Sequence, residues 1–114
     1  MLNKEVAVKK IFTAEVLEAG GTATSEATKV SFADGFHVVQ FDGTFTGSAS
    51  VTITYSVSLD NVTFQTPASA SDIVTSTTAD GYFAFSPEMC KWIKIIITET
   101  GQDTVTVSML YGNQ

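Results

Sequence analysis

The clearest signal in the chain is a regular alternation of apolar and polar residues. Between Ala49 and Leu59 the odd-numbered positions are apolar or aromatic, and the even-numbered positions are all serine or threonine. Side chains of a β-strand point alternately to its two faces, so this stretch predicts a strand with one buried face and one wet face. The same alternation from Val105 to Met109 predicts a second strand of this kind.

The stretch from Met89 to Thr98 carries large side chains on both of its predicted faces. One face holds Ile93, Ile95 and Ile97, and the other holds Trp92, Lys94 and Ile96. Such a run, rich in β-branched residues, is typical of a central strand covered on both faces or of one whose second face meets a partner. We expect burial within the monomer, and Trp92 is the best candidate for an interface residue.

The N-terminal segment permits two interpretations. Residues 5–17 alternate with a break only at Lys10, although residues 5–18 are also long enough for a helix. A helical wheel mixes the apolar and charged positions, so we favour a strand. Residues 18–27 predict a flexible loop from their glycine, serine and threonine content. That loop would let residues 1–17 pair within the subunit or extend as an arm to a neighbour.

Turns are predicted where an aspartate precedes glycine or asparagine, with an aromatic residue soon after. The four sites are Asp34-Gly35, Asp42-Gly43, Asp60-Asn61 and Asp80-Gly81. These pairs supply the positive φ angles of tight turns. The strands between them are predicted at 5–17, 28–33, 36–42, 48–59, 62–66, 72–77, 81–86 and 89–99, with 103–111 as a further strand if the first is an arm. We therefore expect one domain over residues 1–114, an all-β antiparallel sandwich of about eight strands resembling a jelly roll.

Composition narrows the classes of partner. The 114 residues carry a formal net charge of -6, and all six cationic side chains are lysines. Nucleic acid is excluded as a partner, because its binding needs clustered cations that displace counterions. No apolar run reaches 18 residues, so we expect no membrane span. Polar and charged residues interrupt residues 1–10, so we expect no secretory signal, and the initiator Met1 and the free Cys90 favour a cytoplasm-like compartment.

The residues that could carry catalysis are few. His37 lies in an apolar stretch and is interpreted as a core residue with one hydrogen bond, and Cys90 as a small buried hydrophobe. A nucleophilic Cys90–His37 pair is the alternative. No phosphate loop, nucleophile elbow or zinc motif occurs, so we expect no enzyme activity and no cofactor.

Two kinds of binding site remain open. The aspartates lie in predicted turns, where this residue type is expected without any ligand. A calcium site or a carboxylate pair for glycoside hydrolysis would have to be assembled from separate loops. A carbohydrate site would need exposed aromatic rings beside polar groups. Tyr55 is expected in the core and Tyr82 and Tyr111 near a turn or the terminus, so Trp92 is the strongest candidate, with burial as its alternative.

Four segments carry a family resemblance: residues 51–64, 81–87, 91–98 and 104–108. They resemble small β-sandwich proteins of tailed-phage virions, which decorate capsids or build tail and fibre parts. They are also similar to the C-terminal half of discoidin-like, galactose-binding jelly rolls. The stretch before Val51 is short for the discoidin-like domain, and the arginine common on its sugar-facing side is missing.

The phage resemblance implies a structural virion protein, most simply a capsid decoration or cement protein. Its partners would be the major capsid protein or other virion components and further copies of the chain, with a trimer favoured. It would reside in the virion after assembly in the bacterial host cytoplasm. The alternative is a small carbohydrate- or receptor-binding module of a tail fibre or a cell surface.

Overall fold

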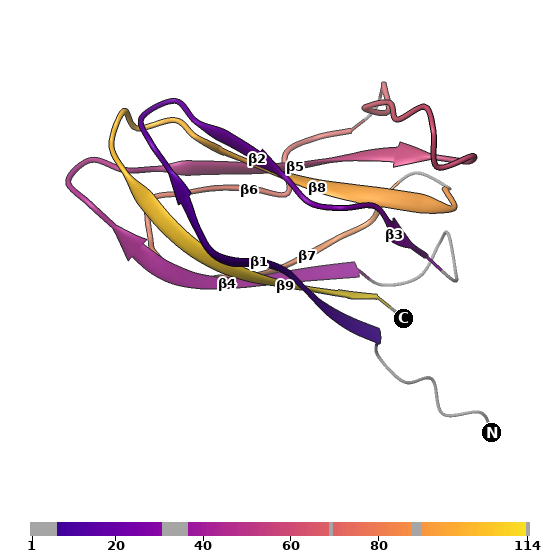
Figure 1. The fold of residues 1–114 in the computed structure, drawn as a ribbon, viewed down its shortest axis with the longest axis horizontal. Coiled ribbons are helices and arrows are strands. Elements are labelled where there is room, and N and C mark those ends of the chain that lie inside the picture. Colours follow the sequence, from indigo (N-terminus) through magenta and orange to yellow (C-terminus); the bar gives the residue numbers. More distant parts are fainter. Residues whose placement is uncertain (1–6, 31–36, 69, 88–89, 114) are drawn as a thin grey trace.

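A computed structural model of the chain describes residues 7–30, 37–68, 70–87 and 90–113, and these form two antiparallel β-sheets packed face to face (Figure 1). Sheet A has the strand order β1-β9-β4-β7, and sheet B has the order β2-β8-β5-β6 with β3 also paired to β8. The prediction of an all-β sandwich is therefore confirmed. None of the described residues belongs to a helix that is long and apolar enough to cross a membrane.

The described part of the chain contains nine strands. They are β1 (Ala7–Leu17), β2 (Thr22–Thr24), β3 (Thr28–Lys29), β4 (His37–Phe45), β5 (Val51–Ser58), β6 (Val74–Ser76), β7 (Gly81–Phe85), β8 (Trp92–Glu99) and β9 (Val105–Asn113).

Most of the core consists of odd-numbered residues of β4, β5, β8 and β9. On β5, β8 and β9 the buried side chains include Val51, Ile53, Tyr55, Ile93, Ile95, Ile97, Val105, Val107 and Met109. The predicted alternation is confirmed at these positions. The second face of β8 differs from the prediction, because Trp92, Lys94 and Ile96 on the outer face of sheet B are only half-buried.

The N-terminal segment is part of the sandwich. Strand β1 pairs antiparallel with β9 of the same chain, from Ala7 opposite Asn113 to Leu17 opposite Val105. Phe12 and Leu17 are buried in the core. Residues 7–17 are therefore a strand and not a free arm, while residues 1–6 lie outside the described residues. Part of the predicted loop 18–27 is also strand, since β2 and β8 pair through the backbone.

One predicted turn lies inside a strand instead. Asp42 and Gly43 belong to β4, and Gly43 has no positive φ. A Cβ on Gly43 would stand 1.9 Å from the carbonyl oxygen of Thr106, so the glycine permits close approach of β4 and β9. Gly81 likewise begins β7 without a positive φ.

The Asp60-Asn61 turn is confirmed, because Asn61 has a φ of 60°. Residues 62–66 do not form the predicted strand, and only Gln65 bridges to Val57. The Asp34-Gly35 turn lies outside the described residues.

Candidate functional site

One end of the sandwich is closed by hydrogen-bonded turns. We call it the turn end; it comprises the connections 18–21, 46–50 and 100–104, at the left of Figure 1. Buried Glu99 lies at its centre and accepts hydrogen bonds from the backbone N–H groups of Gly20, Ser50, Gly101 and Gln102 at 2.6–3.2 Å. Burial alone would raise the pKa of Glu99, but these donors hold it below its usual value. The carboxylate therefore joins three turns.

Two aspartates have the same structural role. Asp103 accepts hydrogen bonds from the Thr46 hydroxyl and the Ser48 and Thr104 backbone, which lower its pKa. Asp60 accepts from the backbone N–H groups of Val62 and Thr63 within its own turn. Among the described residues, no group of three or more histidine, cysteine, aspartate or glutamate side chains could hold a metal ion.

His37 and Cys90 are both buried. His37 is 1% exposed, and its Nδ1 lies 2.7 Å from the hydroxyl of Tyr111. Among the described residues its Nε2 has no hydrogen-bond partner, and burial lowers the pKa of the imidazole. Burial also raises the pKa of the Cys90 thiol, which disfavours the reactive thiolate. Neither side chain has the exposure that a catalytic base or a nucleophile needs.

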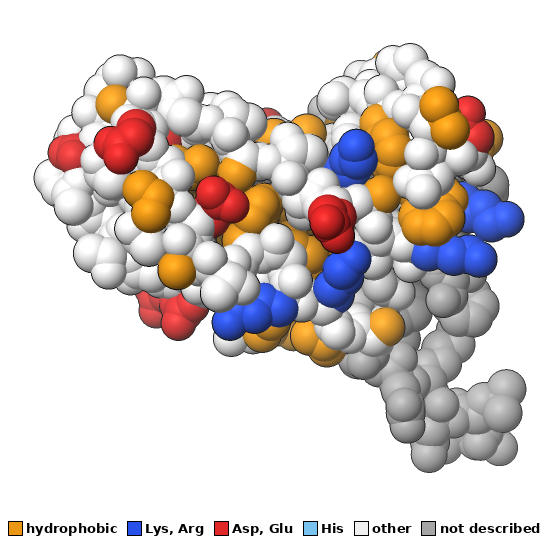
Figure 2. All heavy atoms as spheres, viewed as in Figure 1, with side chains coloured by type: hydrophobic (Ala, Val, Ile, Leu, Met, Phe, Trp, Pro, Cys, Tyr) orange, Lys and Arg blue, Asp and Glu red, His pale blue; other side chains and the backbone are white. Residues whose placement is uncertain are grey.

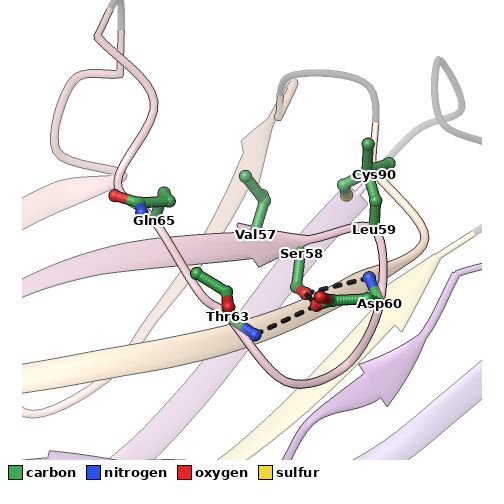
Figure 3. A pocket seen from close by; sticks show the side chains of 7 residues that line it. All are labelled: Val57, Ser58, Leu59, Asp60, Thr63, Gln65 and Cys90. Atoms are coloured by element: carbon green, nitrogen blue, oxygen red, sulfur yellow. Dashed lines mark hydrogen bonds between the residues drawn. The ribbon is translucent and has the colours of Figure 1, made fainter.

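The opposite end of the sandwich, which we call the loop end, carries an open hollow. Its volume is about 390 Å³, and it lies between the end of β5, the start of the β5–β6 connection and Cys90 (Figure 3). The lining residues are Val57, Ser58, Leu59, Asp60, Thr63, Gln65 and Cys90. Ser58 and Thr63 hydrogen-bond Asp60 and fix the turn that forms one wall.

Two large apolar side chains at this turn are exposed. Leu59 is 73% exposed and Val62 is 80% exposed. They flank Asp60 and Asn61, whose turn conformation leaves both neighbours outside the core. The alternation of apolar and polar residues continues through Leu59 and therefore predicts that its side chain lies on the buried face of β5. The feature of the sequence that indicates exposure of Leu59 is the Asp60-Asn61 turn pair, which follows it directly.

Trp92 lies beside the loop end on the outer face of sheet B. It pairs with Ser58 of β5 and with Lys29 of β3. Two residue pairs further along β8, on the same face, the Lys94 ammonium lies 4.2 Å from the centre of the Phe64 ring. The small side chains of Ser56 and Ser58 leave room for these larger groups to meet above the sheet. Trp92 is therefore half-buried at a surface instead of lying in the core.

The tyrosines divide clearly. Tyr55 and Tyr111 are buried, whereas Tyr82 on β7 is 68% exposed. A hollow of about 430 Å³ beside Tyr82 is lined by Gln40, Asp42 and Asp80 among others. The sequence favours Trp92 as the exposed ring and indicates for Tyr82 only a position near a turn.

Known proteins resemble this chain in fold. No protein-family model matches it, and no curated protein sequence matches it significantly. Among solved structures, VP2 of the infectious bursal disease virus subviral particle has a TM-score of 0.59 and 16% identity, covering 96% of this chain. The chain spans only 32% of that viral chain.

Two similar structures are close to this chain in length. The SPBc2 prophage-derived protein YomS has a TM-score of 0.50 and 13% identity, with 98% of both chains covered. The CBM36-1 domain of a multidomain xylanase from the hindgut metagenome of Trinervitermes trinervoides has a TM-score of 0.54 and 10% identity, covering 96% of this chain and 98% of that one. At such identities the similarity establishes the β-sandwich fold.

Proposed function

We propose that this chain is a structural protein of a phage or prophage virion, which acts as a capsid decoration or cement protein. It binds the major capsid protein, or another virion component, through the loop end. The observation that carries the proposal is the pair of exposed apolar side chains of the Asp60-Asn61 turn, Leu59, which lines the hollow, and Val62, which follows on the same turn. Exposed apolar groups beside a cavity are typical of protein interaction sites.

The rest of the molecule supports a role without catalysis, and we include in the proposal that the chain is not an enzyme. His37 and Cys90 are buried, and Glu99, Asp60 and Asp103 are occupied by hydrogen bonds that hold turns. The fold similarity to a viral capsid protein and to a prophage-derived protein supports the virion setting.

We further propose that the protein acts as a homotrimer. A shell is held by many modest contacts, so linking three copies raises the effective concentration of each loop end at its neighbouring capsid site. Rings of three arise when one surface patch meets a different patch of the next copy and the rotation closes. The protein is then assembled in the host cytoplasm and resides in the virion.

The experiment begins with particles purified from an induced culture of the organism that encodes the chain. Mass spectrometry measures the number of copies per major capsid protein. We expect a fixed ratio that survives density-gradient purification. Absence of the chain from the particles, while it is abundant in the lysate, would refute the virion role.

Variants then test the loop end. Particles made without the chain are reloaded with purified protein, and binding is measured by cosedimentation. The double variant Leu59→Asp/Val62→Asp should bind at least about tenfold more weakly, because it places charges in an apolar contact. The matched control is Val8→Asp/Val16→Asp, which alters two residues of β1 that are 62% and 52% exposed. Equal loss in both variants would contradict the assignment of the interface.

A second candidate function is a small carbohydrate- or receptor-binding module. The specific observation in its favour is the exposed ring of Tyr82 beside a polar hollow. The similarity of fold to a carbohydrate-binding domain is consistent with it.

A further inference from the structure

A row of side chains crosses the outer face of sheet A. Gln40 of β4 pairs with Tyr82 of β7 on one side and with Leu110 of β9 on the other. Leu110 in turn pairs with Lys10 of β1. Neighbouring strands are ~4.8 Å apart, so the row extends about 14 Å across all four strands.

Two hollows follow this row and share lining residues of β4. One, of about 430 Å³, is lined by Gln40, Phe41, Asp42, Asp80, Gly81 and Tyr82. The other, of about 170 Å³, is lined by Lys10, Gln40, Phe41, Asp42, Ser108, Met109 and Leu110. Gln40, Phe41 and Asp42 belong to both linings, and we call the two hollows together the sheet A groove.

The polar groups of the groove differ from the acids of the turn end. Glu99 and Asp103 are occupied by backbone and hydroxyl donors. Over residues 7–30, 37–68, 70–87 and 90–113, by contrast, the side chains of Gln40, Asp42 and Asp80 have no hydrogen-bond partner. Their acceptor oxygens are available to a ligand.

We propose that the sheet A groove binds a neutral saccharide. The exposed ring of Tyr82 provides an apolar platform for the C–H face of a sugar ring, and Asp42, Asp80 and Gln40 accept hydrogen bonds from its hydroxyl groups. Two carboxylates against the single Lys10 make the groove repel phosphate, sulfate and uronate groups. This inference deepens the second candidate function and does not depend on the virion role.

The test is native electrophoresis in gels that contain one polymer each. The neutral probes are xylan, galactomannan and a mixed-linkage β-glucan, and the acidic probe is polygalacturonate. We expect at least one neutral polymer to retard the protein and polygalacturonate to leave it unchanged. Tyr82→Ala should weaken binding by at least about tenfold, whereas Tyr82→Phe keeps the ring and should retain most of it.

Matched variants separate the groove from other surfaces. Asp42→Asn/Asp80→Asn should weaken retardation, because neutral amides accept weaker hydrogen bonds than carboxylates. Trp92→Ala, on the opposite sheet, should leave it unchanged. The proposal is overturned if no neutral polymer retards the chain, if Tyr82→Ala behaves as the unmodified protein, or if polygalacturonate binds through Tyr82. The particle experiment can fail or succeed independently of these results.

Discussion

At the scale of single residues, the acidic side chains show how one residue type serves two purposes. Glu99 is buried and accepts backbone hydrogen bonds, whereas the carboxylates of Asp42 and Asp80 line a groove and accept no hydrogen bond from the part of the chain that the structure describes. A carboxylate that accepts several N–H bonds is stabilised in its charged form. Glu99 therefore stabilises the folded protein, and its oxygens are not available to a ligand.

Replacement of Glu99 by glutamine should destabilise the protein. The amide group would point N–H donors at the backbone N–H groups of Ser50 and Gly101, or of Gly20 and Gln102. We expect the thermal midpoint of Glu99→Gln to fall by several degrees at pH 7. Glu26→Gln, at an exposed position, is the control and should leave the midpoint unchanged.

Low pH should remove the difference in thermal midpoint between the unmodified protein and Glu99→Gln. The pKa of Glu99 is lower in the folded protein than its ordinary value of 4.5, so its contribution to stability is complete above about pH 4.5. It is lost as the pH falls through the lowered folded value. Thermal unfolding at pH 7 and pH 3 should show the two proteins converging at the lower pH. A difference that persists unchanged in acid would show that Glu99 does not act through its charge.

His37 predicts a second pH dependence, in a higher range. An unpaired N–H is costlier than an unpaired lone pair, so we assign the proton of neutral His37 to Nδ1, where it donates to the Tyr111 hydroxyl. The pKa of His37 is lowered below 6.5 by burial. The unfolded chain therefore binds the proton more readily, and the free energy of unfolding falls as the pH drops below about 6.5.

Substitution by phenylalanine should abolish that dependence. The ring would occupy the same space against Phe85 and Tyr111. Urea unfolding between pH 7 and pH 5 should give a sloping free energy for the unmodified protein and a flat one for His37→Phe. Parallel slopes would mean that another group titrates in this range.

At the scale of strands, the sheets depend on close approach at one position. Gly43→Ala would place a Cβ 1.9 Å from the carbonyl oxygen of Thr106, a backbone atom that can move only if β4 and β9 separate. We expect a loss of about 3 kcal/mol in the free energy of unfolding. The thermal midpoint should fall by roughly 10 °C.

Thr44→Ala is the matched control for this substitution. It lies in the same strand with an exposed side chain and should change stability little. If Gly43→Ala unfolds like Thr44→Ala, then the close approach of β4 and β9 at Gly43 does not contribute to stability.

The alternation of residue types predicts the long strands because burial follows it directly. Val51, Ile53 and Tyr55 face the core, as do the odd residues of β8 and β9. Strand β2 was missed because its three residues, Thr22–Thr24, owe their conformation to pairing with β8, more than seventy positions away. The alternation of residue types reflects the local preference of a segment for the strand conformation, whereas pairing with a distant strand depends on the tertiary structure.

The candidate sites depend even more on tertiary structure. Asp42 and Gly43 have the composition of a turn, yet close packing of β4 on β9 makes them strand. The exposure of Leu59 and Tyr82 depends on where β5 ends and on β7 being the outer strand of sheet A. Sequence analysis could identify the aromatic candidates but not which of them the folded chain leaves in solvent.

At the scale of the whole molecule, the two ends of the sandwich differ. The turn end holds Glu18, Glu99 and Asp103, and Figure 2 shows acidic but no lysine side chains at the left end of the molecule. The lysines Lys29, Lys91 and Lys94 lie on or beside β3 and the first half of β8, toward the loop end. Acidic side chains at one end and the lysines of β3 and β8 near the other favour contacts between different patches of neighbouring copies, the kind that closes into a ring.

The solution mass tests this arrangement. Light scattering coupled to size-exclusion chromatography should give about three times 12.1 kDa for the unmodified chain. Because contacts between charged ends are screened by salt, the trimer should dissociate more readily at 1 M NaCl than at 0.1 M, where the screening length is about 10 Å. Leu59→Asp/Val62→Asp and Val8→Asp/Val16→Asp should both still form trimers, because the proposed capsid contact through Leu59 and Val62 is separate from the contact that joins the copies. A monomer for the unmodified chain at every concentration would refute the preformed trimer and require the capsid to bind single copies.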